Sequence, residues 1–488
     1  MTRRLALNDG NRRWWTLAAM CFALFMIMLD NTVVNVALPS IKADLGASYS
    51  TLAWTVSAYT LSLGVLLITG GRLGDIYGRR RVFLIGVVAF AASSAFIGFS
   101  QSEAWLIGGR AIQGVGAALM MPATLSIITN TFAPEERGKA LGTWAGVSAM
   151  ALAIGPVVGG YLVEYVSWQS IFFLNVPVAA GALAITLFST CESRDETVLA
   201  RLDLGGIAAI SVGLGALTLA LLEAPAWGWG SGRNVALFAV AALGLAAFAI
   251  VERRVRVPMI DFGFFASRTF LGASMVAFIV SFAMLAMFFF IAIYMQTIEG
   301  YSPLQAGLRF LPTTLMIIVI SPLSGRLADR IGPRSLMTAG LLLVAGSLFW
   351  QSHLSVGSGY AFLAPGFVLM GMGMGLIMSP MSTAAMNAVD RTKAGVAGGV
   401  LSTSRMIGGT LGIAVLGAFI GNPGRPEAYV ESLGHGLRLG SVVAALGAIV
   451  AWTLISPKAA GATGMTVPAG ETIVPPAPAE GARETVRA

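Results

Sequence analysis

The sequence predicts an all-α integral membrane protein. Of its 488 residues, 56% are apolar and only 11% are charged, whereas a soluble globular chain carries about 25% charged residues. A mean hydropathy of +0.79 leaves too little polar surface to coat soluble domains of this size. The apolar residues are therefore expected to face lipid, and the composition argues against an ordinary soluble enzyme.

Apolar segments long enough to cross a hydrocarbon layer of roughly 30 Å, about 20 residues each, recur along the whole chain. Because an open sheet edge in lipid would leave backbone groups unpaired, these segments are predicted to be helices. We predict fourteen spans, with approximate limits 14–38, 51–70, 82–100, 104–128, 140–163, 168–189, 204–222, 234–251, 269–295, 304–324, 335–351, 359–380, 394–420 and 437–455.

Lysine and arginine are distributed unevenly over the predicted loops. With the N-terminus inside, 24 of the 31 Lys and Arg residues lie on the cytoplasmic side and 5 on the outer side, which leaves Arg110 and Arg405 within spans. This asymmetry satisfies the positive-inside rule. We therefore expect a multi-pass protein of a cell membrane, the cytoplasmic membrane in a bacterium, with both termini cytoplasmic. The net charge of +8 then reflects topology, and nucleic acid is not expected as a partner.

Two loops carry an internal repeat. Residues 71–80 (GRLGDIYGRR) and 325–334 (GRLADRIGPR) share six of ten residues at an offset of 254. The match pairs spans 1 to 6 with spans 9 to 14, which predicts a 6+2+6 arrangement with a site between two parallel halves, as in many secondary transporters. The predicted parts are a cytoplasmic head (1–13), an N-terminal six-helix bundle (14–189), a two-helix insert with its loops (190–268), a C-terminal six-helix bundle (269–455) and a disordered cytoplasmic tail (456–488).

These loops and four further motifs resemble the major facilitator superfamily, and within it the fourteen-span drug:proton antiporter family of multidrug resistance exporters. The further motifs are residues 29–39, 110–114 and 155–160, and Trp168 with Phe172, Phe173, Asn175 and Pro177. One departure is Ala151, where the family motif usually begins with Gly. The resemblance implies the major facilitator fold, alternating access, a small-molecule substrate, a proton gradient as energy source and no cofactor. We expect a monomer in the lipid bilayer.

Two charged residues in the N-terminal half form the predicted proton-coupling site. Asp30 is the only carboxylate well inside a predicted span, where an unpaired charge is costly. Arg110 lies at a similar depth when residues are counted from the outer span ends at roughly 1.5 Å each, so the two residues could interact. The resemblance implies that both take part in proton coupling. A purely structural ion pair is the alternative.

Four residues are candidates for lining a substrate cavity. Asn31 and Asn35 share a helical face near Asp30, and Gln113 shares the face of Arg110. Arg405 is a cation in the middle of a span. It could attract an anionic substrate group or pair with a span-end acid such as Glu223, and a cavity role and a packing role are both open.

Two sets of residues are expected to serve conformational change. The predicted latch residues, which the repeat and the resemblance both indicate, are Gly71, Asp75, Gly78, Arg79, Arg80 and Asp329. A solvated loop that only fixes topology is the alternative. The predicted antiporter motif is Gly155, Pro156, Gly159 and Gly160. Its small residues allow close helix approach, and the resemblance implies that the motif marks exporters, although tight packing alone would also explain it.

The predicted function is proton-coupled export of amphiphilic small molecules or antibiotics. Export of one endogenous metabolite, lipid or self-made antibiotic is the alternative, and a membrane receptor or enzyme is a third possibility. No catalytic residue and no metal site is predicted, because two Cys and two His form no ligand motif. ATP coupling is disfavoured since the chain has no phosphate-binding loop motif.

Overall fold

The structure is a computed structural model that describes residues 9–194, 203–255, 258, 260, 262–389, 394–420 and 425–457. Within these ranges the chain forms sixteen α-helices and one short 3-10 helix, and no strand. The predicted all-α fold is confirmed. The first part of the predicted head and nearly all of the predicted tail, residues 1–8 and 458–488, lie outside the described residues.

The first seven helices occupy the N-terminal part of the chain. Their bounds are α1 (Asp9–Leu45), α2 (Tyr49–Tyr77), α3 (Arg79–Gly98), α4 (Glu103–Thr131), α5 (Pro134–Tyr165), α6 (Ser170–Phe173) and α7 (Asn175–Ser189). Serine caps start two of them, because the Ser48 and Ser102 side chains accept hydrogen bonds from backbone N–H groups of the first turns of α2 and α4. Gly78, with φ of 108°, separates α2 from α3.

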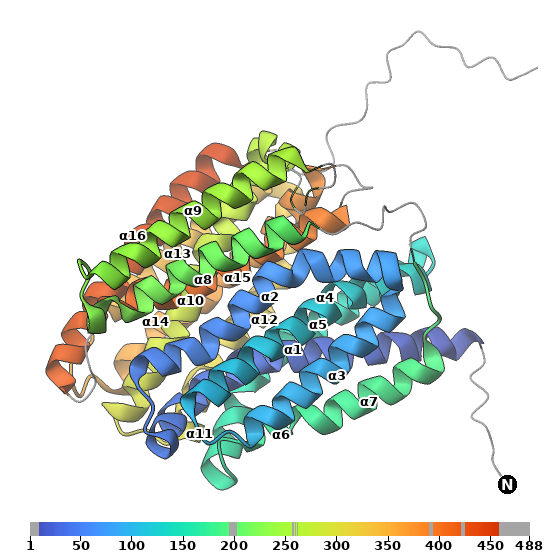
Figure 1. The fold of residues 1–488 in the computed structure, drawn as a ribbon. Helices are drawn as coiled ribbons and strands as arrows, with labels where there is room; N and C mark the ends of the chain where they lie inside the picture. The colour runs from blue at the N-terminus through green and yellow to red at the C-terminus, as the bar shows by residue number, and fades with distance from the viewer. Residues whose placement is uncertain are drawn as a thin grey trace, which may run out of the picture.

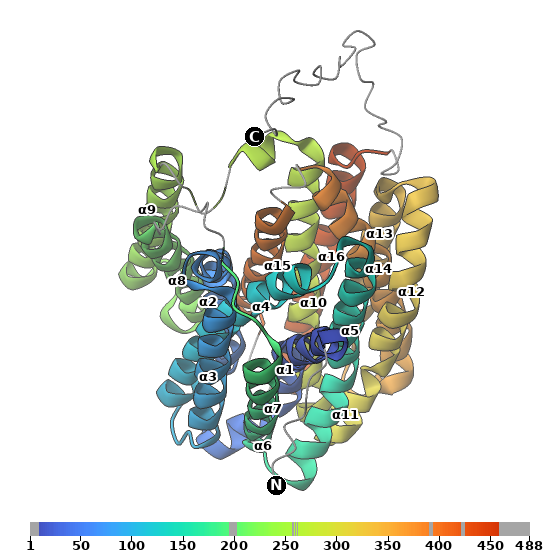
Figure 2. The same cartoon turned by 90° about the vertical axis from the view of Figure 1, so that its right-hand side faces the viewer.

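The remaining helices follow in the same way. They are α8 (Leu204–Trp227), α9 (Gly232–Arg254), η1 (Phe262–Ala266), α10 (Arg268–Thr297), α11 (Pro303–Arg309), α12 (Leu311–Ile331), α13 (Pro333–Gln351), α14 (Gly359–Asn387), α15 (Ala394–Gly417) and α16 (Pro426–Leu454). Helices α8 and α9 pack on each other, and α8 also contacts α2 and α15. Figures 1 and 2 show this pair, in green, on the outside of the bundle.

Twelve helical segments of the described chain are long and apolar enough to cross a membrane, and α6 with α7 and α11 with α12 each count as one of them. The predicted spans 140–163 and 335–351 are helical as α5 and α13, but neither is among the twelve. Several side chains of α5 lie outside the described part of the structure, and α13 begins with Pro333 and Arg334, which lower its mean hydropathy. The predicted count of fourteen spans is therefore not confirmed.

Two contact zones join the N-terminal helices to the C-terminal ones. Helix α2 packs along α15, and α5 packs on α11 and the start of α12. Among the twelve segments α10 is the most enclosed, α1 and α2 follow equally, and α9 is mostly exposed. The predicted residues Asp30, Asn31 and Asn35 therefore lie on an enclosed helix, α1.

Candidate functional site

Asp30 of α1 and Arg110 of α4 form a buried ion pair. The Arg110 Nη1 atom lies 2.5 Å from Asp30 Oδ2, and both side chains are at most 1% exposed. The structure thus brings together the two residues that were predicted to lie at the same depth in the membrane. Full burial of both charges makes the pair an enclosed site and excludes a solvated surface bridge in this conformation.

Three neutral side chains complete the polar surroundings of this pair. Gln113 accepts a hydrogen bond from Arg110 Nη1 at 2.6 Å and donates to Asp30 Oδ1 at 3.0 Å. Gln113 also donates to Ser94 Oγ at 2.7 Å. Asn175 donates to Ser94 Oγ at 3.0 Å and more weakly to Asp30 Oδ1 at 3.4 Å. These five residues, from α1, α3, α4 and α7, are called the Asp30 network below.

Helix α2 holds the Arg110 guanidinium from the other side. Its Nε atom donates to the backbone carbonyl of Thr55 at 2.8 Å, and its Cζ atom lies 4.3 Å from the centre of the Tyr59 ring, a distance at which a cation is attracted to the ring face. Close packing of α4 on α2 needs a glycine one turn later, since a Cβ added at Gly114 would lie 2.5 Å from the Tyr59 carbonyl oxygen.

Two of the predicted cavity residues are positioned differently from the prediction. Gln113 is fully buried, and its amide is used within the Asp30 network. Asn35 is 2% exposed and donates to the Asn31 carbonyl at 3.1 Å. Asn31 is partly exposed, and its amide donates to the Ile27 carbonyl. Neighbouring helices cover most of this helical face, and its role as a cavity wall stays a prediction.

Sequence reasoning missed three residues of this site. Ser94, Thr55 and Tyr59 received no role, and Asn175 was quoted only as part of a motif. A polar residue inside an apolar span is the signal that could have pointed to Ser94, because a buried hydroxyl needs a partner. Thr55 acts through its carbonyl, which has no sequence signature.

In the first repeated segment, residues 71–80, an ion pair joins the end of α2 to the start of α3. Asp75 Oδ1 accepts from Arg79 Nε at 2.9 Å and from Arg79 Nη2 at 2.7 Å, an i,i+4 pair. Gly71 lies against α4, where an added Cβ would be 3.3 Å from Pro122 Cβ. Asp329 lies in α12, but its side chain is outside the described part of the structure. The state-dependent latch therefore stays a prediction.

A segment that follows α7 is bound over this loop. Glu192 accepts hydrogen bonds from the backbone N–H groups of Arg80 at 3.0 Å and Arg81 at 3.2 Å, and Ser193 O accepts from Arg79 N at 2.9 Å. A carboxylate at a helix N-terminus is stabilised by the unpaired N–H groups there. The segment at residues 190–194, which we call the strap, thus caps α3.

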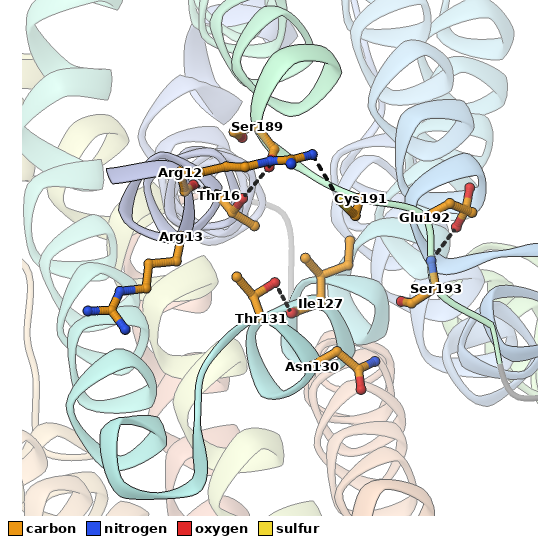
Figure 3. A pocket seen from close by; sticks show the side chains of 10 residues that line it. All are labelled: Arg12, Arg13, Thr16, Ile127, Asn130, Thr131, Ser189, Cys191, Glu192 and Ser193. Carbon is orange, nitrogen blue, oxygen red and sulfur yellow. Dashed lines mark hydrogen bonds between the residues drawn. The ribbon is translucent and has the colours of Figure 1, made fainter. Parts of the chain in front are cut away.

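The strap also borders a pocket of about 400 Å³ at the end of the bundle where α1 begins. Figure 3 shows that α1, α4 and the strap supply its walls. Arg12 donates to Ser189 O at 2.9 Å and to Cys191 Sγ at 2.8 Å, and Arg13 pairs with Glu136 at 2.5 Å. Both arginines are therefore engaged with the protein.

The antiporter motif lies between α1 and α11. Gly159 faces α1, where an added Cβ would lie 2.6 Å from Val33 Cγ2, and Gly155 faces Thr32. Gly160 faces α11, with an added Cβ 2.6 Å from Leu304 Cα, and Pro156 contacts the same helix. The motif thus joins the helix of Asp30 to the C-terminal half.

A carboxylate strengthens this contact one turn later. Glu164 Oε2 accepts from the backbone N–H of Leu304 at 3.0 Å. Hydrogen bonds from the Ser302 hydroxyl and then from Leu304 N–H hold the pKa of the Glu164 carboxyl below its ordinary value. Ser302 is the N-cap of α11, so an acid of one half caps a helix of the other half.

The opposite end of the same α5 face is uncovered. Gly142 precedes Gly160 by about five turns and so lies on the same side of the helix. Among the described residues, no atom of another element comes within 4 Å of a Cβ added at Gly142 or Gly146. Along α5, the two halves therefore meet at the end near Tyr165 and are apart toward the end near Pro134.

Arg405 of α15 has neutral neighbours. Its Nη2 atom donates to Ser402 Oγ at 3.3 Å, and its Nη1 atom lies 4.0 Å from Met378 Sδ. The expected alternative partner, Glu223, accepts a hydrogen bond from Ser50 instead. In the ranges that the structure describes, no cluster of three His, Cys, Asp or Glu residues suited to a metal ion occurs.

Comparison with known proteins agrees with this architecture. A model of the Major Facilitator Superfamily matches residues 20–413. The chain is 38% identical to the tetracenomycin C resistance and export protein of Streptomyces glaucescens, over 84% of this chain and 76% of that one. It is 37% identical to a puromycin resistance protein of Streptomyces alboniger over 92% of both chains, and 38% identical to the multidrug resistance protein Stp of Mycobacterium tuberculosis over 83% and 75%. The chain belongs to the Major Facilitator Superfamily.

Proposed function

We propose that this multi-pass membrane protein exports amphiphilic small molecules, antibiotics among them, by alternating access in exchange for protons. The observation that carries the proposal is the set of relatives, whose names describe antibiotic resistance, multidrug resistance and export, at 37% to 38% identity over more than four fifths of this chain. Superfamily membership makes a small-molecule substrate the expected cargo.

In this proposal the two halves rock around a site between them. The six-span halves are α1 to α7 and α10 to α16, and α8 with α9 is an insert. The closed contact at Gly160 and the uncovered face at Gly142 describe one of the two states. If the termini are cytoplasmic, as the distribution of Lys and Arg indicates, this state opens toward the cytoplasm and would load substrate there.

Proton coupling is assigned to the Asp30 network. While Asp30 is charged, Arg110 holds it at 2.5 Å. Protonation removes that attraction and leaves the Arg110 cation with Gln113 and the Thr55 carbonyl. The network therefore has two states of different charge, which is what a proton-driven switch requires.

A short mechanical route leads from this network to the closed contact. Thr32 and Val33, two and three residues after Asp30, pack on Gly155 and Gly159 of α5. The same stretch of α5 packs on α11 through Pro156 and Gly160. Movement of α1 after protonation would thus act on the contact that closes the two halves. The route is a proposal that coupling measurements must test.

The experiment is substrate-driven proton release in inverted membrane vesicles that contain the protein. A pH-sensitive dye reports the imposed gradient while a panel of cationic, neutral and anionic fluorescent amphiphiles is added. We expect at least one compound to collapse the gradient, and its transport to stop when an uncoupler is present. Asp30→Asn should abolish proton release, whereas Asp44→Asn, a carboxylate outside the network that bonds to Trp168, should not.

Two results would overturn parts of this proposal. Transport that continues unchanged with the uncoupler would remove proton coupling but keep export. Proton release that persists in Asp30→Asn would leave the ion pair with a structural role only. A response to a single compound in the panel would favour the narrow exporter over the multidrug one.

A further inference from the structure

Within the described residues, Arg405 differs from Arg110 in having no carboxylate partner. Among the residues that the structure describes, Arg110 pairs with Asp30, whereas Arg405 forms no ion pair. Its two contacts are a hydroxyl and a thioether sulfur, and its Nε atom is buried with no hydrogen-bond partner within the described ranges. A charge inside a membrane span is costly unless something pairs with it.

Two faces of α15 are occupied by other helices. Toward α10, Cβ atoms added at Gly408 and Gly412 would lie 2.8 Å from the Cα atoms of Phe278 and Phe282. Toward α2, the Thr403 hydroxyl donates to a backbone carbonyl at 3.0 Å and the Thr410 hydroxyl bonds to a threonine at 2.7 Å. These contacts fix the rotation of α15 about its axis, so the direction of the remaining side chains follows from it.

Arg405 points away from lipid and away from the α8–α9 insert. Ile407 packs with the apolar cluster of the insert on the outer side of α15. Two residues along a helix are about 200° apart, so Arg405 leaves α15 on the opposite side. There it meets Met378 of α14, a helix of the C-terminal half. The guanidinium therefore lies against α14, on the side of α15 opposite the insert.

We propose that Arg405 binds an anionic group of the exported molecule, so that the preferred substrates are amphiphiles that carry a carboxylate, a phenolate or a similar acid. This inference rests on the proposed export function, because it takes the ligand to be the cargo. A guanidinium offers a fork of N–H donors that matches planar oxyanions, and a flexible methionine beside it accommodates the apolar body of a ligand.

The charge balance of the described interior supports the same choice. Asp30 and Arg110 cancel each other within the N-terminal half, while the charge of Arg405 remains. An anion would complete the balance, whereas a cation would meet repulsion in a medium of low dielectric constant. The structure therefore predicts that binding weakens from anionic through neutral to cationic forms of one scaffold.

The test is equilibrium binding of two related dyes to the purified full-length protein, followed by fluorescence anisotropy. Fluorescein is anionic and rhodamine 6G is cationic, and both share a xanthene ring system. We expect the protein to prefer fluorescein by about tenfold or more, a ratio that corresponds to about 1.4 kcal/mol. Arg405→Gln should remove this preference, and Arg405→Lys should keep part of it. Arg233→Gln, an exposed arginine near the start of α9, is the matched control.

Three outcomes contradict the assignment. The first is equal affinity of the wild-type protein for the two dyes. The second is unchanged fluorescein binding in Arg405→Gln. The third is an equal loss of affinity for both dyes in Arg405→Gln and in Arg405→Lys, which would show that Arg405 has a structural role. Failure of the export function is distinguishable, because it appears as absent vesicle transport while the dye preference and its dependence on Arg405 persist.

Discussion

Asp30 Oδ2 and Arg110 Nη1 lie 2.5 Å apart, with side chains at most 1% exposed. Removing one partner of such a buried pair destabilises the protein, because the other charge is left unpaired in a medium of low dielectric constant. Such a loss typically costs about 3 to 5 kcal/mol, although the pair itself adds little net stability. The two residues should therefore respond very differently to single and double substitution.

The first prediction concerns this pair as a unit. Asp30→Asn and Arg110→Gln should each lower the thermal stability of the purified protein, since each leaves one charge buried and unpaired. The double variant should be less destabilised than the sum of the two singles, with a coupling energy of about 1 to 3 kcal/mol. Thermal unfolding in detergent, followed by tryptophan fluorescence, measures this cycle.

The same variants separate stability from coupling. If the proposed function is right, the double variant regains stability but not proton release. Additive effects of the two substitutions on stability would contradict the ion pair as described.

The second prediction concerns the contact of α5 with α11. Gly160→Val should force the two helices apart, because even a Cβ at this position would lie 2.6 Å from Leu304 Cα. Spin labels at the exposed residues Tyr161 and Leu308, in a background without Cys21 and Cys191, should then report a longer distance across the contact. Gly142→Val is the matched control, because space is open there, and should leave the distance unchanged.

A third prediction follows from Glu164. Hydrogen bonds from Ser302 and Leu304 hold the pKa of this carboxyl below its ordinary value of 4.5. The contact therefore favours the closed state at any pH above about 4.5 and is lost as the pH falls through the lowered pKa in that state. The same spin-label distance should lengthen only in this acid range. In Glu164→Gln the acid-dependent part of the change should be absent, and an identical pH profile in that variant would contradict the assignment.

Much of this architecture follows from local sequence properties. Hydropathy predicts the helices, and the repeated loops predict two related halves. Counting residues from the span ends predicted that Asp30 and Arg110 lie at one depth, because helical rise is constant. The motif at Gly155–Gly160 was expected to allow close approach, and the structure adds that its residues face two different helices.

Other features depend on contacts between distant segments, which sequence reasoning cannot supply. Gln113 was expected at the cavity, but its amide is buried and bonded to Asp30 of α1 and Ser94 of α3. Periodicity predicts the face on which a residue lies but not what covers that face. Glu192 was not predicted either, because its hydrogen bond to the Arg80 backbone joins residues 112 positions apart.

The last prediction concerns the strap and its cap on α3. Glu192 offers a carboxylate to the N–H groups of Arg80 and Arg81, so Glu192→Ala should lower the local stability of the first turn of α3. An anion at a helix N-terminus contributes about 0.3 to 1 kcal/mol, which corresponds to amide exchange up to about fivefold faster at these positions. Hydrogen exchange followed by mass spectrometry measures the effect directly.

Glu136→Ala, which removes a nearby carboxylate paired with Arg13, should leave the first turn of α3 unchanged. Equal exchange in wild-type and Glu192→Ala protein would show that the strap does not cap this helix in solution. Faster exchange together with unaltered transport would show that the Glu192 cap stabilises α3 but is not needed for the transport cycle.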